Sequence, residues 1–263
     1  MSSVEALILG IIQGLTEFLP VSSSGHLELA KVLFGSNALP KESLLFTVLL
    51  HLATALSTVV LYRKDLIQLF SKAMAREKQA VHFSLAIILS MVPAALVGFF
   101  LEDFIDSLFS GNTLLVGAML IVTAGLLYVA DKPQSSENNL THKRALLIGI
   151  AQAIAILPGI SRSGATISTA VLLGVQREQA ARFSFLMVVP LIFGKIAKDL
   201  LSGDLLQTAI DPLHLVIGFT AAFISGLLAC SWMIALVKRS KLLYFSLYCL
   251  LAGSIALLMT LFS

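Results

Sequence analysis

Two stretches of the chain share one pattern, and this pattern decides the expected fold. Residues 10–35 read GIIQGLTEFLPVSSSGHLELAKVLFG, and residues 149–174 read GIAQAIAILPGISRSGATISTAVLLG. The two align without a gap at an offset of 139 positions, with nine identities in 26 positions. Several identities are polar or glycine residues, which a hydrophobic composition does not favour. They are Gln13/Gln152, Ser22/Ser161, Ser24/Ser163 and Gly25/Gly164. The sequence therefore predicts an internal repeat.

Both stretches are apolar segments that are interrupted before they could cross a bilayer. Residues 6–19 and 145–157 are each followed by a break rich in Ser and Gly, and then by a second short stretch at 27–35 or 165–174. Apolar runs of about 10–14 residues are typical of re-entrant segments. Irregular backbone at membrane depth is tolerated only where it is buried in protein or lines a cavity. Each break is therefore a candidate site.

The composition of the whole chain indicates a membrane protein. Of its 263 residues, 57% are hydrophobic and 13% are charged, and the mean hydropathy is +0.94. A soluble domain has about 45–50% apolar and about 25% charged residues, so soluble, disordered and fibrous classes are excluded. The first basic residue is Lys31, so no cleaved secretory signal is expected. Cys230 and Cys249 lack metal-ligand spacing and are expected to pack as small apolar residues.

Six apolar stretches are candidate spans. They lie at residues 44–62, 83–101, 112–130, 183–200, 213–237 and 242–262. The expected fold class is an all-α polytopic membrane protein, with six transmembrane helices plus two re-entrant helix-loop-helix segments. Three spans separate the two breaks, and an odd number turns the second copy upside down. We therefore expect a single membrane domain over 1–263, with repeat 1 at about 1–131 and an inverted-topology repeat 2 at about 140–263. Such folds place their site where the two interrupted segments meet.

The charges of the loops predict the orientation. Basic residues prevail at 63–82, 131–144 and 238–241, whereas the loops at 102–106 and 199–211 are acidic. The positive-inside rule places the basic loops in the cytoplasm and both termini outside. No basic stripe typical of nucleic-acid binding is present, so nucleic acid is not an expected partner. The composition makes the bilayer one.

Two features of the apolar pattern are less regular. The span at 183–200 is weak because Lys195 and Lys198 lie near its end, where they are expected to snorkel to an interface. Residues 66–81 form an amphipathic pattern that predicts an interfacial helix.

The two breaks have the composition of a phosphate site. Ser-Ser-Ser-Gly at 22–25 and Ser-Arg-Ser-Gly at 161–164 can each open a short helix, whose N-terminal N–H groups favour an anion. Arg162 can bind phosphate oxygens bidentately. The expected phosphate-binding residues are Ser22, Ser24, Gly25, Ser161, Ser163, Gly164 and Thr166. The serines are also explained as plain helix caps.

The catalytic candidates are Glu17, Ser23, His26 and Arg162. A carboxylate among apolar neighbours is costly and usually functional. Ser23 is the candidate nucleophile, with Glu17 and His26 as its base, orienter or proton donor, and Arg162 would stabilise the transferring phosphoryl group. In the rival assignment His26 attacks directly and Ser23 only binds phosphate.

The supporting residues and the metal follow from the same reasoning. Gln13 and Gln152 occupy matching positions and are expected either to support the site or to bond helix to helix. His51 is expected to be a packing or polar-contact residue. Glu17 alone is thin ligation for Mg²⁺ or Ca²⁺, so a divalent cation would bind mainly through substrate phosphates.

At these residues the chain resembles the undecaprenyl-diphosphate phosphatases of the bacitracin-resistance type. One family motif is Glu/Gln-x-x-x-Glu followed by Pro-x-Ser-Ser-Ser/Thr-x-His, and the other is Pro-Gly-x-Ser-Arg-Ser-x-x-Thr. The first is matched by Gln13, Glu17, Pro20, Ser22, Ser23, Ser24 and His26. The second is matched by Pro158, Gly159, Ser161, Arg162, Ser163 and Thr166. The resemblance extends over nearly the whole chain.

The resemblance implies an enzyme of the bacterial inner membrane. The family converts undecaprenyl diphosphate to undecaprenyl phosphate, the lipid carrier for peptidoglycan, and thereby confers bacitracin resistance. It also implies a divalent cation and a site that opens to the periplasmic side. Gln13 stands where some members have Glu, which weakens a metal site made of two carboxylates.

The competing hypothesis is a transporter or flippase for a phosphate-bearing lipid, because inverted repeats are a transporter architecture. Glu17 with Ser23 and His26 distinguishes the two, since a carrier needs no nucleophile beside a base. The sequence leaves open a homodimer and the preferred length of the prenyl chain.

Overall fold

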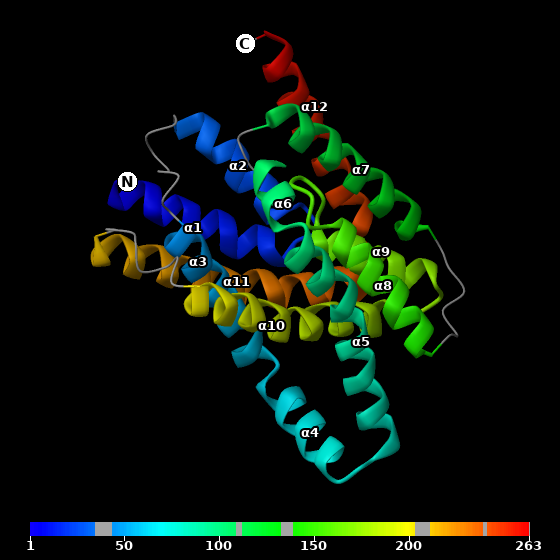
Figure 1. Cartoon of the computed structure of the whole chain (residues 1–263). Coiled ribbons are helices and arrows are strands. Elements are labelled where there is room, and N and C mark those ends of the chain that lie inside the picture. The colour runs from blue at the N-terminus through cyan, green and yellow to red at the C-terminus, as the bar shows by residue number, and fades with distance from the viewer. Residues whose placement is uncertain (35–43, 109–111, 133–138, 203–210, 239–240, 263) are drawn as a thin grey trace.

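The computed structural model describes residues 1–34, 44–108, 112–132, 139–202, 211–238 and 241–262. Within these residues the secondary structure is entirely helical, which confirms the expected all-α class. The twelve helices of this part of the chain (Figure 1) are α1 Ser3–Phe18, α2 Ser23–Phe34, α3 Leu44–Leu61, α4 Arg63–Met74, α5 Lys78–Phe100, α6 Glu102–Leu108, α7 Thr113–Asp131, α8 His142–Ile154, α9 Arg162–Leu172, α10 Arg177–Ser202, α11 Pro212–Lys238 and α12 Leu242–Phe262.

The expected spans are present as long apolar helices. Among the described residues, α5, α7, α10, α11 and α12 are each long and apolar enough to cross a bilayer. The remaining expected span is α3, which continues into α4 after a bend of 73°. The chain is a multi-pass membrane protein with five such helices, or six if the bent pair counts as one span.

Helix α10 begins six residues earlier than the span expected at 183–200. The cause is Arg177, whose guanidinium donates to the carbonyls of Ala130 and Asp131 at the end of α7, at 2.9 and 3.0 Å. This contact ties the first turn of α10 to the end of α7. Lys195 lies about two turns before the end of α10 with its side chain exposed. Its snorkelling to an interface stays a prediction.

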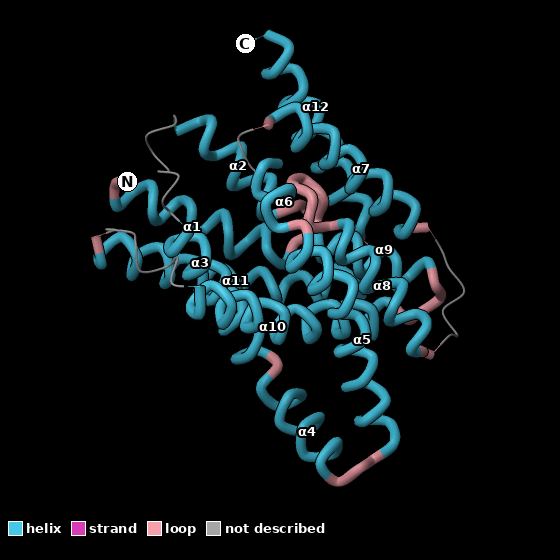
Figure 2. The backbone as a smooth tube through the Cα atoms, in the orientation of Figure 1, coloured by secondary structure: helices cyan, strands magenta, loops and turns pink. Residues whose placement is uncertain are grey.

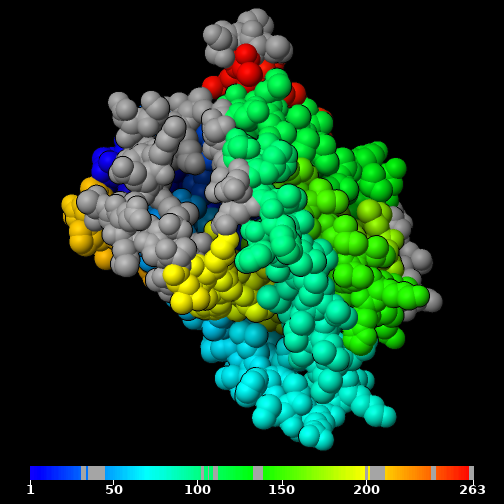
Figure 3. All heavy atoms as spheres, viewed as in Figure 1, coloured from blue at the N-terminus to red at the C-terminus, as the bar shows by residue number. Residues whose placement is uncertain are grey.

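The helix expected at 66–81 is wrong in its bounds. The structure ends α4 at Met74 and starts α5 at Lys78, because the chain turns at Arg76 with a φ of 58°. None of the residues of α4 is buried, and Ile67, Phe70 and Met74 are exposed. With the first turns of α5, α4 projects from the bottom of the bundle in Figures 1 and 3. The short helix α6 was not expected from the sequence.

Both interruptions lie where the sequence predicts them. One separates α1 from α2 at residues 19–22, and the other separates α8 from α9 at residues 155–161. The re-entrant course of the two pairs and the inverted orientation of the second copy stay predictions.

Helices of each half of the chain pack on helices of the other half. Helix α1 packs on α11 and α8 packs on α5, so each helix before a break lies against a span of the other half. The aligned glycines allow these close contacts. A Cβ at Gly10 would lie 2.8 Å from Ala221 Cβ, and one at Gly149 would lie 2.8 Å from Ser90 Cα. The largest buried cluster also joins residues of both halves, such as Leu127 and Phe185. This packing agrees with the expected repeat and brings the two breaks together.

Candidate active site

The two breaks lie against each other in the middle of the bundle (Figure 2). A Cβ at Gly25 would be only 3.1 Å from Gly159 Cα, so the backbones of the two breaks are in close contact there. The Ser163 hydroxyl donates to the carbonyl of Leu19 across the same contact, at 3.3 Å. Residues far apart in the sequence therefore form one site, as the repeat predicts.

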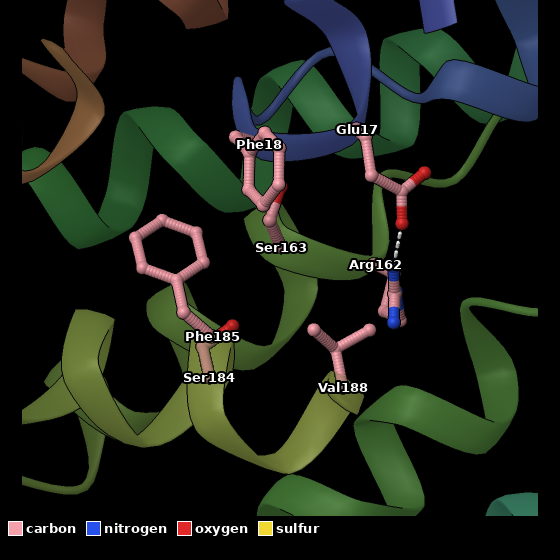
Figure 4. A pocket seen from close by; sticks show the side chains of 7 residues that line it. All are labelled: Glu17, Phe18, Arg162, Ser163, Ser184, Phe185 and Val188. Atoms are coloured by element: carbon pink, nitrogen blue, oxygen red, sulfur yellow. Dashed lines mark hydrogen bonds and ion pairs between the residues drawn. The ribbon is translucent and has the colours of Figure 1, made fainter. Parts of the chain in front are cut away.

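The buried carboxylate of Glu17, at the end of α1, is the centre of the site. Its Oε2 accepts hydrogen bonds from Gln13 Nε2 at 2.9 Å and from the Ser23 hydroxyl at 2.8 Å. Its Oε1 pairs with Arg162 Nη2 (Figure 4). The Glu17 side chain is 3% exposed, so the guanidinium and the two donors replace the water that the charge has lost. Three of the four catalytic candidates are thus joined directly.

The N-termini of α2 and α9 have the same cap. The Ser22 hydroxyl accepts from the Gly25 N–H at 3.2 Å, and the Ser161 hydroxyl accepts from the Gly164 N–H at 3.0 Å. The four residues are two aligned pairs of the repeat. A serine cap satisfies one of the N–H groups that the first turn of a helix leaves unpaired. The expected caps are therefore present; the binding of phosphate at these residues stays a prediction.

Ser23 and Arg162 open the two capped helices at equivalent positions. The hydroxyls of Ser24 and Ser163 lie 3.4 and 3.3 Å from the capping hydroxyls. Two helix N-termini, a guanidinium and a row of hydroxyls thus converge beside Glu17. Positive helix ends and charged donors at one place favour an anion, which agrees with the expected phosphate site without testing it.

Ser22 has a φ of 71°, in the left-handed region that residues other than glycine seldom occupy. Such a conformation costs of order 1–3 kcal/mol and persists only where the surroundings hold it. It stands directly before Ser23, the residue whose hydroxyl donates to Glu17.

His26 does not contact Ser23 through either ring nitrogen. Nδ1 lies 2.8 Å from the Ser22 carbonyl oxygen, and Nε2 lies 2.7 Å from the hydroxyl of Tyr248 on α12. The Ser23 hydroxyl donates to Glu17 instead. Of the bases that the sequence left open for Ser23, Glu17 is the one in hydrogen-bond contact.

A small pocket opens beside the ion pair (Figure 4). Its lining residues are Glu17, Phe18, Arg162, Ser163, Ser184, Phe185 and Val188. Phe18 and Phe185 pack edge to face, with ring centroids 5.8 Å apart. Thr166 lies behind this wall, with its hydroxyl 2.7 Å from that of Ser184 on α10. The lining of the pocket is therefore mixed, with the ion pair and two serines among two phenyl rings and a valine.

The chain matches the family model of the bacitracin resistance protein BacA over residues 6–255. It belongs to the BacA family. An undecaprenyl-diphosphatase of Christiangramia forsetii is 58% identical over 259 residues, which cover 98% of each chain. Proteins of the same name from Bacteroides fragilis and Carboxydothermus hydrogenoformans are 45% and 42% identical, and the matches cover at least 95% of each chain. The resemblance stated from the two motifs is confirmed.

The two matched glutamines have different surroundings in the structure. Gln13 donates to Glu17, but Gln152 Nε2 lies 3.3 Å from the Ser90 carbonyl, where α8 packs on α5. Of the two expected supporting residues, only Gln13 touches the site. Gln152 makes the helix-to-helix bond that the sequence offered as the alternative.

Three further side chains lie at this site: His51, for which the sequence predicted only a packing or polar-contact role, and Ser184 and Tyr248, for which it predicted none. His51 Nε2 on α3 lies 3.9 Å from Glu17 Oε2, while its Nδ1 bonds to the Thr47 carbonyl at 2.8 Å. Ser184 lines the pocket, and Tyr248 binds His26. The only signal for His51 was a histidine inside an apolar span; Ser184 and Tyr248 carried none.

Proposed function

We propose that this chain hydrolyses undecaprenyl diphosphate to undecaprenyl phosphate and inorganic phosphate. The observation that carries the proposal is the contact of Ser23 with Glu17, with Arg162 on the other carboxylate oxygen. A nucleophile within hydrogen-bond reach of a base is the arrangement of covalent catalysis. The names of the relatives, which match over nearly their full length, supply the substrate.

The first step follows from the contacts of Glu17. A terminal phosphoryl group between α2 and α9 competes with Glu17 for Arg162, and the freed carboxylate accepts the Ser23 proton. The Ser23 oxygen forms a bond to phosphorus as the bond to the bridging oxygen breaks, and undecaprenyl phosphate leaves with that oxygen. Arg162 and the helix N-termini stabilise the charge that grows on the phosphoryl oxygens.

The second step releases phosphate. Glu17, which now holds the Ser23 proton, lies beside the phosphoserine. Water attacks phosphorus, and the bond to the Ser23 oxygen breaks. That oxygen recovers its proton, and inorganic phosphate departs. The net reaction consumes one water for each diphosphate.

The site fits a divalent cation only in part. Among the described residues no group of three His, Cys, Asp or Glu side chains could hold a metal. Gln13 Oε1, however, is buried beside Glu17 and has no hydrogen-bond partner in this part of the chain. Gln13 and Glu17 would supply two oxygen ligands for Mg²⁺ or Ca²⁺, with the substrate phosphates supplying others. A bound cation would neutralise part of the charge of the diphosphate.

The proposed reaction gives the protein its role in the cell. It returns the lipid carrier used for peptidoglycan and removes the diphosphate that bacitracin binds. We place the chain in the bacterial inner membrane, with its basic loops in the cytoplasm, both termini outside and the site open to the periplasmic side. Helix α4 with Arg63, Lys64 and Lys72 projects at one end of the bundle, and the C-terminus lies at the opposite end (Figure 1).

The test is phosphate release from undecaprenyl diphosphate by the purified protein in detergent with Mg²⁺ or Ca²⁺. Release by the wild type, with loss in both Ser23→Ala and Arg162→Ala, supports the proposal. Tyr244→Phe serves as the matched control, because this exposed residue lies on α12 away from Glu17. A folded wild type that binds undecaprenyl diphosphate but releases no phosphate would favour the transporter or flippase.

A further inference from the structure

Helix α12 holds the first break through two successive residues. The hydroxyl of Tyr248 lies 2.7 Å from Nε2 of His26, and the two rings are within 11° of parallel. The next residue, Cys249, places its Sγ 3.6 Å from the carbonyl oxygen of Pro20. The last helix of the second half is thus attached to the break of the first half.

The hydrogen bonds of His26 fix where its proton lies. The Ser22 carbonyl can only accept, so Nδ1, at 2.8 Å from it, carries the hydrogen. In the neutral ring Nε2 is then an acceptor, and the Tyr248 hydroxyl is its donor. Which nitrogen of a histidine is protonated depends on the bond that the other nitrogen makes.

His26 in turn acts on the strained residue of the site. The Ser22 carbonyl accepts from the backbone N–H of His26 at 3.1 Å as well as from Nδ1. Ser22 has a φ of 71° and directly precedes Ser23. The contacts therefore run from Tyr248 through His26 to the turn that aims the nucleophile.

The second break is held in a comparable way from α7, the last long helix of the first half. The hydroxyl of Thr123 accepts from the Ser161 N–H at 3.1 Å. Its own hydrogen lies between two carbonyl acceptors, Gly159 of the break at 3.2 Å and Met119 of α7 at 3.1 Å. Each break thus has a hydroxyl-bearing support on a helix of the other half. At the second break the support binds backbone directly; at the first it acts through an imidazole.

We propose that Tyr248 is a positioning residue of the proposed phosphatase site. It keeps His26 in the tautomer with the proton on Nδ1, and His26 thereby holds the Ser22 turn in which Ser23 is aligned with Glu17. The expected effect of Tyr248 on turnover rests on the proposed function. The expected effect of Tyr248 on His26 does not.

The test is a substitution that removes a single oxygen atom, that of the Tyr248 hydroxyl. Tyr248→Phe keeps the ring, and Tyr244→Phe removes an equivalent hydroxyl one turn earlier on the same helix, where the ring lies against Lys241. With undecaprenyl diphosphate as substrate, we expect kcat of Tyr248→Phe to fall about tenfold with KM within about twofold, because one hydrogen bond to a positioned group is lost. Tyr244→Phe should match the wild type.

The second readout is the ¹⁵N spectrum of histidine-labelled protein in detergent, with the His26 signals assigned by their loss in His26→Gln. The wild type should show His26 with its proton on Nδ1 and a hydrogen-bonded Nε2. In Tyr248→Phe the Nε2 signal should move to the value of a free imidazole. If the wild type carries the His26 proton on Nε2, the proposal is overturned, even if Tyr248→Phe does not fold. It is also overturned if Tyr248→Phe folds but its spectra and kcat are those of the wild type.

The two readouts separate this proposal from the function on which it rests. Suppose the wild type releases no phosphate, but its His26 signals are as expected and change in Tyr248→Phe. Tyr248 then supports His26, and only the proposed phosphatase function is contradicted. If the wild type is active and the His26 signals are the same in Tyr248→Phe, only the positioning role of Tyr248 is contradicted.

Discussion

Ser23 and Arg162 are the first residues of two equally capped helices, and both bind the carboxylate of Glu17. They occupy aligned positions of the repeat, 139 residues apart. Two copies of one helix–break–helix unit therefore bring different first residues, a hydroxyl and a guanidinium, to one carboxylate. The two copies differ at this pair of positions and at the carboxylate itself, since Ile156 is aligned with Glu17. In the proposed reaction Ser23 is the nucleophile and Arg162 is its electrostatic partner.

Glu17→Gln should abolish most of the activity. The amide cannot accept the Ser23 proton, and it leaves the Arg162 guanidinium without its counter-ion. General base catalysis contributes about 10²–10⁴-fold, so kcat for phosphate release should fall by at least about 100-fold. Retention of a tenth or more of the wild-type kcat would show that Ser23 does not need Glu17.

Gln13→Glu should strengthen the binding of a divalent cation. A second carboxylate beside Glu17 adds charge where the unpaired Gln13 Oε1 lies, and affinity for hard cations rises with the charge of the ligands. Activity titrated with Mg²⁺ should reach half its maximum at a several-fold lower concentration. Gln152→Glu is the matched control from the repeat, because Gln152 lies at the α5–α8 contact. Equal Mg²⁺ curves for Gln13→Glu and the wild type would remove Gln13 from the cation site.

Gly159→Ala should destabilise the protein. Gly159 has a φ of 96°, and a Cβ there would lie 2.5 Å from the Val116 carbonyl oxygen and 2.8 Å from Met119 Cβ. Strain and overpacking together should cost about 3 kcal/mol, measured as thermal unfolding in detergent. Gly125→Ala on α7 is the control, since no described residue lies within 4 Å of its Cβ position. Equal melting of Gly159→Ala and Gly125→Ala would contradict this account of the break.

His51→Gln should keep most of the activity. The 3.9 Å between His51 Nε2 and Glu17 Oε2 is too long for a hydrogen bond, and the His51 side chain is 33% exposed. A screened interaction of this kind is worth at most about 1 kcal/mol, so kcat should change by no more than about fivefold. A loss as large as that of Glu17→Gln would instead make His51 part of the proton transfer.

The features that the sequence predicts well are those determined by neighbouring residues along the chain. Apolar length predicts the spans, and the serine before each short helix predicts its cap. Glu17 and Arg162 were recognised because a charge at membrane depth is costly unless it is paired. That the two breaks lie close together was predicted from the repeat. The matching serine caps and the close contact of Gly25 with Gly159 agree with this prediction.

The elements that the sequence did not predict depend on packing between helices. Gln13 and Gln152 match, yet only Gln13 has a carboxylate four residues later, because the position aligned with Glu17 is Ile156. Nothing in the local sequence of Tyr248 indicates that α12 passes beside His26. The start of α10 depends on Arg177 reaching carbonyls of α7, which lie more than forty residues earlier.

The central claim is that Ser23 attacks the phosphoryl group while Glu17 accepts its proton. The most direct measurement is acid quenching of the enzyme during turnover of undecaprenyl diphosphate, followed by mass spectrometry of the peptide that contains Ser23 and His26. The account predicts phosphate on Ser23, stable to acid, and no phosphopeptide and no turnover in Ser23→Ala. Phosphate on His26 in a parallel sample quenched in alkali, where phosphohistidine survives, or wild-type turnover by Ser23→Ala, would contradict it.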